Sequence, residues 1–306
     1  MGTPAFAVPP LAALAGAGHE LLAVVAQPDR PAGRGHALRE PATKAWARAG
    51  GIPVLQPEKV RDGRLAAELR ALAPDVLCVA AYGRILGKDL LALAPHGAVN
   101  VHASLLPRYR GAAPIQWAVA SGDRETGVTV MQMDEGLDTG DVLLQATLPI
   151  QPDDTAETLS PRLAALGGAT LVRALALLAR GELVPVRQDP AQATLARILV
   201  REDGKVDWTR PAAEIANRLR GFSPWPGAWT TLDGRVVKLI AAGAEEPARA
   251  EGGPGLARRS PAGGLSVGCG GGTSLLVRRL QPEGKAPQDA LAFLNGLRRD
   301  AVVLGT

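Results

Sequence analysis

Short, almost uninterrupted apolar runs alternate with helical patterns through the first part of this chain. The runs lie at residues 20–27, 52–55, 76–81 and 98–102, and the helical patterns lie at 42–49 and 61–73. Strands that are apolar along their whole length are buried on both faces, and their alternation with helices is typical of α/β proteins. The sequence therefore predicts a doubly wound, mostly parallel, Rossmann-like sheet. We expect a loop at 28–41, which is dense in Pro, Gly and Arg.

The pattern changes further along the chain. Two more strands at 126–133 and 141–150 and a long amphipathic helix at 155–180 complete a first domain, for which we predict the bounds 1–182. A linker at 183–205 leads to a second domain at 206–306. There, short β-like pieces alternate with Gly and Pro, as in a small β-barrel. These pieces are 228–232, 236–241, 264–269 and 274–280. We interpret 244–263 as a mobile loop.

The net charge of the 306-residue chain is confined to its last third. Residues 1–200 hold nineteen basic and nineteen acidic side chains, whereas residues 201–306 hold fifteen basic and eleven acidic ones. A local basic excess is the footprint of a polyanionic partner, although a solvated surface explains four charges equally well. Three tryptophans of the same region, Trp208, Trp225 and Trp229, suggest base stacking, but the prolines among them favour packing in a core.

The cysteine count, the uncharged segments and the absence of nucleotide-binding motifs exclude several classes of protein. Two cysteines, Cys78 and Cys269, cannot form a disulfide framework or a four-ligand zinc cluster, so we expect a reducing, cytoplasmic location. The uncharged residues 1–18 lack the basic start of a signal peptide. The uncharged residues 90–107 contain two histidines and two prolines, so we expect no membrane span. The chain has no G-x-G-x-x-G or P-loop motif, which weakens dehydrogenase and kinase interpretations.

Asn100 and His102 are the strongest catalytic candidates. They lie two residues apart in the predicted strand 98–102, so their side chains project from one face, at the end of the strand where α/β sheets bind ligands. A lone histidine is more often a surface or core residue, but an imidazole beside an amide combines a proton donor with an oxyanion donor. Asp138 lies in a glycine-flanked loop, and a carboxylate there can hold the imidazole in one tautomer. The pattern leaves open whether Asp138 reaches His102.

Several motifs together resemble the methionyl-tRNA formyltransferase family, within the wider group of 10-formyltetrahydrofolate-dependent formyltransferases. The likeness spans essentially the whole chain. The Asn-x-His and Leu-Asp elements are shared with the wider group, whereas the inserted loop at 27–35 and the C-terminal half are specific to the tRNA enzymes. The segments that carry the resemblance are 27–35 (QPDRPAGRG), 100–107 (NVHASLLP), 110–116 (RGAAPIQ), 126–129 (TGVT), 136–141 (GLDTGD), 222–229 (FSPWPGAW) and 281–285 (QPEGK).

The resemblance implies a reaction and roles for the candidate residues. The family transfers a formyl group from 10-formyltetrahydrofolate to the α-amino group of methionine esterified to initiator tRNA. Asn100, His102 and Asp138 match its catalytic trio. The Asn100 amide and the His102 imidazole would stabilise the tetrahedral oxyanion, while Asp138 would hold His102 and help to move a proton from the attacking amine to N10 of the folate. No metal is required.

The resemblance also implies binding segments for the two substrates. Arg34 matches a residue that contacts the tRNA acceptor end, and a C-terminal OB-like barrel is expected to hold the tRNA. Because His36 and Ala37 stand where lysines are common, Arg30 and Arg39 are expected to add charge for the tRNA. We expect a monomer. The segment matched to folate binding consists of Ser104, Leu105, Leu106 and Pro107.

One departure from the family pattern concerns the start of the sheet. The family ordinarily has a hydrophobic strand just before the sequence Gly-Thr-Pro, which stands here at residues 2–4. That strand is central, between 20–27 and 76–81, so its absence would split the sheet and leave two ladders without partners. We therefore expect apolar codons in frame upstream of Met1, and low stability for a genuinely shortened chain.

Two other functions stay open at this point. A formyltransferase acting on a small amine, such as glycinamide ribonucleotide or an amino sugar, would share the chemistry of Asn100, His102 and Asp138 but would not need the Arg-rich loop. A non-catalytic RNA-binding protein would explain the charge asymmetry and leave those three residues without a role.

Overall fold

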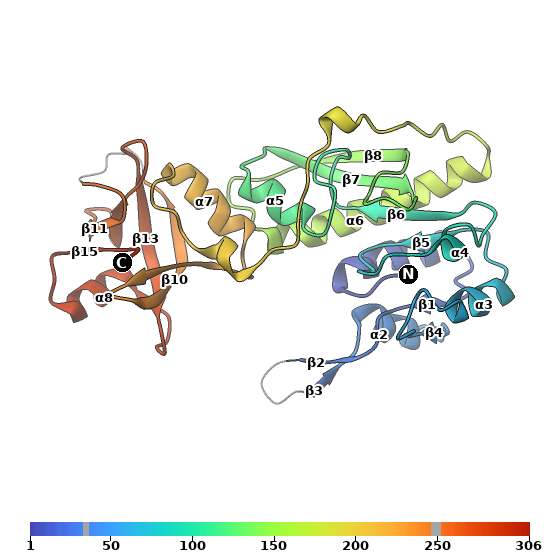
Figure 1. Ribbon diagram of the computed structural model, residues 1–306, viewed down its shortest axis with the longest axis horizontal. Coiled ribbons are helices and arrows are strands. Elements are labelled where there is room, and N and C mark those ends of the chain that lie inside the picture. Colours follow the sequence, from blue (N-terminus) through green and yellow to red (C-terminus); the bar gives the residue numbers. More distant parts are fainter. Residues whose placement is uncertain (33–36, 246–251) are drawn as a thin grey trace. The chain divides into compact units, whose positions relative to one another are not determined.

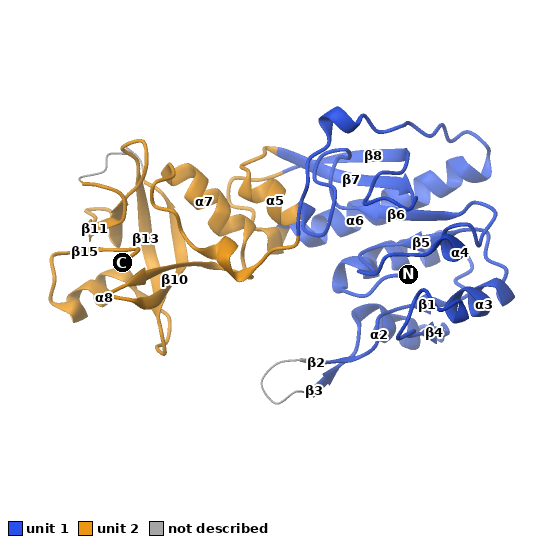
Figure 2. Cartoon of the chain, in the orientation of Figure 1, with its two compact units in different colours: residues 1–114, 125–149, 159–197 blue, residues 115–124, 150–158, 198–306 orange. Residues whose placement is uncertain are grey.

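The chain folds into two units, each assembled from separate stretches of sequence (Figure 2). The computed structural model describes residues 1–32, 37–245 and 252–306. Unit 1 comprises residues 1–114, 125–149 and 159–197. Unit 2 comprises residues 115–124, 150–158 and 198–306.

Unit 1 contains the strands and helices that the apolar runs predict (Figure 1). The predicted helix 42–49 and strand 98–102 are confirmed to the residue. The strands are β1 (Val24–Val25), β2 (Arg30–Ala32), β3 (Ala37–Arg39), β4 (Val54–Leu55), β5 (Leu77–Val79), β6 (Ala98–His102), β7 (Glu125–Gln132) and β8 (Val142–Pro149). The helices are α1 (Val8–Gly16), α2 (Ala42–Ala49), α3 (Arg64–Ala71), α4 (Lys88–Leu91) and α6 (Ala156–Ala179), whose first three residues belong to unit 2. Single 3-10 turns are η1 (Ala5–Ala7) and η2 (Pro190–Gln192).

Helix α6 covers one face of the sheet that β5 to β8 form. Its buried Leu171 and Leu175 pack against Val101 of β6 and Val130 of β7. The helix and the sheet approach each other closely at Gly167, where an added Cβ would lie 2.7 Å from a methyl carbon of Val101. By length and composition α6 is also able to cross a membrane, a property that buried core helices share, and 44% of its most apolar window is buried. The absence of a membrane span therefore stays a prediction.

Residues 28–41 form more than the loop that their composition predicts. β2 and β3 pair as an antiparallel hairpin, with Arg30 opposite Arg39 and Pro31 opposite Leu38. A proline is compatible with a two-stranded ribbon because the missing N–H can face away from the partner strand. Residues 33–36 lie outside the described residues.

The expected division of the sheet is confirmed. β1 and β4 form one parallel pair, whereas β5, β6, β7 and β8 form a separate sheet in that order, parallel between β5 and β6 and antiparallel beyond. Within the described chain, Met1 and Gly2 bridge the two sheets: Gly2 N–H donates to the Val25 carbonyl (2.9 Å), and Ala80 N–H donates to the Met1 carbonyl (2.9 Å). Two residues thus occupy the place where a whole strand was expected.

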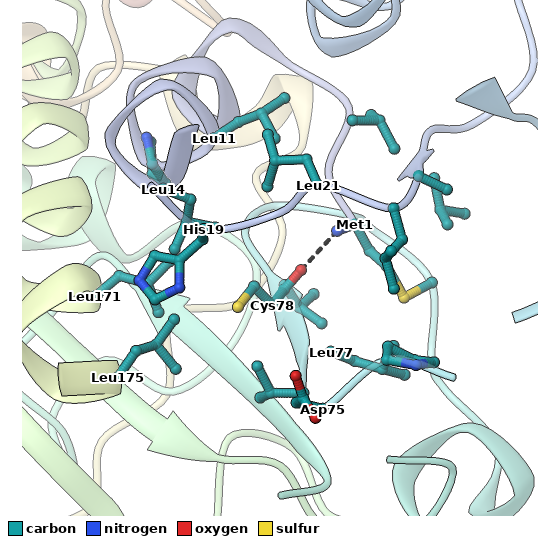
Figure 3. A pocket seen from close by; sticks show the side chains of 18 of the residues that line it. Met1, Leu11, Leu14, His19, Leu21, Asp75, Leu77, Cys78, Leu171 and Leu175 are labelled. Carbon is teal, nitrogen blue, oxygen red and sulfur yellow. Dashed lines mark hydrogen bonds between the residues drawn. The ribbon is translucent and has the colours of Figure 1, made fainter. Parts of the chain in front are cut away.

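A groove continues from this bridge between β1 and β5 (Figure 3). Its lining is mostly apolar and also includes His19, Glu20, Asp75 and His96. Its volume is about 540 Å³, large enough for several side chains. Leu11 and Leu14 of α1, Leu171 and Leu175 of α6 and the backbone of β5 around Cys78 line it (Figure 3). A groove walled by two strand edges and by leucines from the covering helices has the shape and chemistry of a β-strand.

Filling this groove is expected to stabilise unit 1. An extension of five or six apolar residues placed before Met1 would pair with the edges of β1 and β5. Burial of one Val, Leu or Ile side chain stabilises the folded state by about 1.5–3 kcal/mol. Ordering the backbone of each added residue costs about 1–2 kcal/mol in conformational entropy. The net gain is a few kcal/mol, and the midpoint of thermal unfolding should rise by roughly 2–4 °C for each kcal/mol. A Gly-Ser extension of equal length is the control, and equal midpoints for both extensions would show that the groove does not accept a strand.

Unit 2 is built on a curled antiparallel sheet, which corresponds to the predicted β-barrel. The strand order is β15-β11-β12-β13-β10-β9, with β14 paired to β13. Its strands are β9 (Ala228–Leu232), β10 (Arg235–Ala244), β11 (Leu256–Arg259), β12 (Leu265–Gly268), β13 (Ser274–Pro282), β14 (Gln288–Asp289) and β15 (Ala301–Val303). Its helices are α5 (Pro114–Ala120), whose first residue belongs to unit 1, α7 (Ala212–Gly221) and α8 (Ala290–Leu297), with a 3-10 turn η3 (Arg201–Gly204).

The three tryptophans of this unit differ in burial. Trp208 is buried in the core, and its indole Nε1 donates to the Thr230 hydroxyl (3.0 Å), so the predicted packing role is confirmed for this residue. Trp225 is 56% exposed, and the prediction that it packs in the core is wrong. Trp229 is half-buried and lies beneath the cationic groups of Arg201 and Lys205. The prolines on both sides of Trp225 stop the chain from continuing as a strand that would turn this ring inward.

The prediction of a loop at 244–263 is wrong for the second half of this segment, because β11 lies there and pairs with β12 and β15. Residues 246–251 lie outside the described chain. Glu245, at the edge of this segment, accepts hydrogen bonds from the hydroxyls of Ser260 (2.6 Å), Ser266 (2.5 Å) and Ser274 (3.0 Å). Partial burial raises the pKa of the Glu245 carboxyl, but the three hydroxyls and the nearby Arg278 outweigh it and hold the pKa below its ordinary value.

Glu245→Gln is expected to destabilise unit 2 by about 1 kcal/mol at neutral pH, after allowance for solvent screening of a half-exposed group. Because the pKa of the carboxyl is lowered by folding, its contribution is present above the ordinary value of 4.5 and is lost as the pH falls through the folded value. Denaturant unfolding at pH 7 and at pH 3 measures the difference. Asp300→Asn, at an exposed carboxylate of the same unit, is the control. A Glu245→Gln deficit that persisted unchanged at pH 3 would contradict this assignment.

Candidate active site

Strand β6 carries the two polar side chains from which the site is built. All five of its residues are buried, and it lies between β5, parallel to it, and β7, antiparallel to it. Asn100 and His102 are 8% and 6% exposed and share one face, as the period of a strand predicts. Among the described residues no hydrogen bond involves the Asn100 side chain. Its amide is therefore able to donate to a ligand oxygen at the end of the strand.

Both ring nitrogens of His102 face protein oxygens. Nε2 lies 2.8 Å from the Tyr109 carbonyl, which can only accept, so this contact requires a proton on Nε2. Nδ1 lies 3.6 Å from Oδ2 of Asp138. The structure thus brings Asp138 to His102, the question that the sequence pattern left open. A carboxylate and a carbonyl on opposite sides of an imidazole fix the orientation of its ring.

The backbone around Asp138 directs its carboxylate toward His102. Asp138 has a left-handed conformation (φ 52°), which is uncommon for a residue with a side chain. Its Oδ2 accepts a hydrogen bond from the Gly111 N–H (2.8 Å). Gly111 itself has φ 117°, and a Cβ there would lie 2.8 Å from the Ala196 carbonyl oxygen, so only glycine fits without strain.

The segment from Ser104 to Pro107 is shaped by two residues of neighbouring strands. The Thr129 hydroxyl, fully buried on β7, donates to the Ser104 carbonyl (2.7 Å) and accepts from the Leu106 N–H (3.0 Å). Gln145 of β8 donates to the Leu106 carbonyl (2.8 Å) and to the Thr129 hydroxyl (2.9 Å). The sequence motifs assigned no role to Thr129 or Gln145. Thr129 lies in segment 126–129 of the family resemblance, but its place opposite His102 comes from the strand register in the structure.

The connector, residues 180–197 after α6, forms a second support for the loop that follows β6. The Arg110 N–H donates to the Thr194 carbonyl (2.8 Å), and the Tyr109 N–H donates to the Thr194 hydroxyl (2.8 Å). Ala196 N–H donates to the Arg110 carbonyl (2.7 Å). The carbonyl that faces His102 therefore belongs to a loop held by residues more than eighty positions away in sequence.

Two of the arginines expected to bind tRNA lie on the β2–β3 hairpin. Arg30 and Arg39 are exposed cross-strand neighbours, and Arg34 lies outside the described residues. Asp29, at the base of the hairpin, pairs with Lys44 (2.7 Å) and accepts a hydrogen bond from Gln56 (2.7 Å). These bonds lower the pKa of the Asp29 carboxyl below its ordinary value, with the bond from Lys44 as the largest cause. No hydrogen bond or ion pair in the described residues joins these arginines to His102 or Asp138.

The residues that the structure describes include no group of three or more His, Cys, Asp or Glu side chains placed to hold a metal ion. Cys78 and Cys269 are free, and burial raises the pKa of both thiols to about 11. Thiolates, the form that binds metals and attacks substrates, are therefore rare at neutral pH. The expectation that no metal is required stays a prediction.

The fold and the site define a formyl transferase. A model of the formyl transferase family matches residues 1–175, and a model of the formyl transferase C-terminal domain matches residues 198–298. The methionyl-tRNA formyltransferase of Anaeromyxobacter sp. (strain K) is 71% identical over 308 aligned positions, which cover 100% of this chain and 98% of that protein. The protein of the same name from Myxococcus xanthus is 53% identical and covers 97% of this chain and 93% of its own length. The chain belongs to the methionyl-tRNA formyltransferase family.

Solved structures share the fold at much lower identity. The N-formyltransferase of Helicobacter canadensis, in complex with folinic acid and dTDP-3-aminofucose, superposes with a TM-score of 0.67 at 18% identity and covers 92% of this chain and 97% of that chain. HypX of Aquifex aeolicus, in complex with tetrahydrofolic acid, superposes with a TM-score of 0.57 at 19% identity over 82% of this chain and 44% of that chain. The predicted fold class is therefore confirmed.

Proposed function

We propose that this chain transfers a formyl group from 10-formyltetrahydrofolate to the α-amino group of methionyl initiator tRNA. The observation that carries the proposal is the identity of 71%, over nearly the full length of both proteins, with a methionyl-tRNA formyltransferase. The arrangement of Asn100, His102 and Asp138 supports it, because acyl transfer needs an oxyanion donor beside a group that moves protons.

In this proposal the three residues divide the work of the reaction. The amine nitrogen attacks the formyl carbon, and the bond from that carbon to N10 of the folate breaks. The Asn100 amide donates to the oxygen that becomes negatively charged between these events. The Nε2–H of His102 adds a second donor when it turns from the Tyr109 carbonyl to this oxygen. The Asp138 carboxylate keeps the ring of His102 in place and takes part in moving the proton from the amine to N10. The segment of Ser104, Leu105, Leu106 and Pro107 is proposed to contact the folate, with Thr129 and Gln145 holding its backbone.

The remaining assignments concern the tRNA and the context of the reaction. We assign catalysis to residues 1–182, a linker to 183–205 and tRNA binding to 206–306 together with the hairpin arginines. The basic excess of residues 201–306 supports this division, because phosphate contacts supply much of the affinity for nucleic acids. The protein is proposed to act in the cytoplasm as a monomer, without a metal and without a membrane.

A single assay tests the proposed function. Formyl transfer from 10-formyltetrahydrofolate is measured with charged initiator tRNA, and with charged elongator methionyl-tRNA, glycinamide ribonucleotide and an amino sugar nucleotide as controls. Transfer to initiator tRNA well above all controls supports the proposal. Transfer to a small amine alone would instead identify a small-molecule formyltransferase, and RNA binding without transfer would identify a non-catalytic RNA-binding protein.

Asn100→Ala and His102→Ala are expected to cut turnover by at least tens-fold and up to about 10³-fold, because one oxyanion donor typically accounts for about 10²–10³ in kcat. Steady-state kinetics with saturating folate and tRNA measures the loss, and circular dichroism checks the fold. Gln192→Ala, at an exposed side chain of the connector, is the control. Near-normal turnover in either site variant would remove that residue from the mechanism.

Arg34→Ala is expected to raise KM for the tRNA several-fold and to leave KM for the folate unchanged, because a loop arginine contacts phosphate rather than the reacting atoms. Arg30→Ala and Arg39→Ala are expected to act in the same direction with smaller effects. Kinetics at two salt concentrations provides the check, since loss of a phosphate contact also reduces the salt dependence. Equal KM values for wild type and Arg34→Ala would show that this arginine does not contact the tRNA.

A further inference from the structure

One glutamine of the connector hydrogen-bonds, through both atoms of its amide group, to the two loops that meet at His102. Gln188 is 5% exposed and lies after α6 in the sequence. Its Oε1 accepts from Nε (3.0 Å) and Nη2 (2.7 Å) of Arg110. Its Nε2 donates to the carbonyls of Asp138 (2.9 Å) and Gly140 (2.6 Å). All four hydrogen-bonding positions of the amide are thereby occupied.

Among the described residues, the two loops that Gln188 joins supply the oxygens that face the two ring nitrogens of His102. The loop of Arg110 contributes the Tyr109 carbonyl opposite Nε2 and the Gly111 N–H that binds the Asp138 carboxylate. The other loop contributes that carboxylate, opposite Nδ1. A side chain that fixes the separation of these loops therefore fixes the distance between the carboxylate and the ring.

The backbone of Asp138 needs such support. A residue with a side chain persists in the left-handed region only where its surroundings hold it there, and the bond from Gln188 is made to the carbonyl of this same residue. On the far side of the loop, Gly140 packs so closely that a Cβ would lie 1.8 Å from the Gln132 carbonyl oxygen. The loop is thus held between β7 on one side and the Gln188 amide on the other.

We propose that Gln188 is a positioning residue for formyl transfer, acting through Asp138. This inference rests on the proposed function, because the roles of Asp138 and His102 belong to it. Gln188 touches neither substrate nor the reacting atoms in this scheme. It sets the orientation of the carboxylate that holds His102.

Two substitutions separate the halves of the amide. Gln188→Met removes both the acceptor for Arg110 and the donor to the Asp138 loop at nearly constant volume. Gln188→Glu keeps the acceptor for Arg110 but turns an oxygen toward two carbonyl oxygens that it cannot bind. Both variants are expected to lower kcat by roughly ten- to a hundred-fold, the cost of misplacing a catalytic group by about 1 Å, with little change in KM for either substrate. Gln192→Met, at an exposed glutamine of the same connector that bonds only to Asp189 in the described residues, is the matched control and should retain wild-type kcat.

A double-mutant cycle distinguishes positioning from a general structural role. In an Asp138→Asn background, Gln188→Met should reduce kcat by less than about two-fold, because the carboxylate that it positions is already gone. The inference would be overturned if Gln188→Met lowered kcat by the same factor in the Asp138→Asn background as in the wild type. Wild-type kcat in both Gln188 variants would also overturn it.

A spectroscopic measurement keeps the test independent of tRNA turnover. The ¹⁵N resonances of the His102 ring report its contacts, and they should shift in Gln188→Met and stay unchanged in Gln192→Met. Unchanged His102 resonances in Gln188→Met would overturn the inference even if the enzyme transfers formyl groups. Absence of transfer by the wild-type protein, with the expected shift observed, would instead refute the proposed function and leave the positioning of Asp138 by Gln188 established.

Discussion

The site depends on the burial of two polar side chains at the carboxyl end of β6. A buried polar group without a partner costs about 1–3 kcal/mol, and β6 is enclosed by β5, β7 and the helices that cover the sheet. The His102 ring must therefore find oxygens in the loops beyond the strand, and it does so at Tyr109 and Asp138. The Asn100 amide makes no hydrogen bond among the described residues, which suits a donor whose acceptor arrives with a substrate.

The same constraint explains why the surrounding loops are held from several directions. Thr129 and Gln145 fix the backbone of the segment from Ser104 to Pro107, and Thr194 fixes the loop around Arg110. Each of these bonds joins a loop to a strand or connector distant in sequence. Tertiary contacts therefore position the loops in addition to local turn bonds, such as that from the Ser104 hydroxyl to the Arg108 carbonyl. A site arranged in this way needs little reorganisation when charge develops on a bound substrate.

The groove between β1 and β5 shows the opposite situation. There Met1 and Gly2 join the strand edges, and the side chains of Thr3 and Gln27 add hydrogen bonds to the Tyr82 carbonyl. The leucines of α1 and α6 face a volume of about 540 Å³. The sheet that carries Asn100 and His102 is complete without that volume being filled, because β5 to β8 pair among themselves. The groove therefore affects the stability of unit 1 more directly than the geometry of the site.

The sequence by itself determined the local features of this protein. Apolar periodicity located the helix at 42–49 and the strand at 98–102, and the two-residue period of a strand placed Asn100 and His102 on one face. It misjudged strand β11, whose pairing depends on β12 and β15. It also misjudged the hairpin at 28–41, where strands form despite a composition typical of loops, and the exposure of Trp225, which lies between two prolines. Only the tertiary structure decided that Asp138 reaches His102 and that Gln188 ties both loops together. These contacts join residues 36 to 78 positions apart, a separation over which periodicity and turn propensity carry no information.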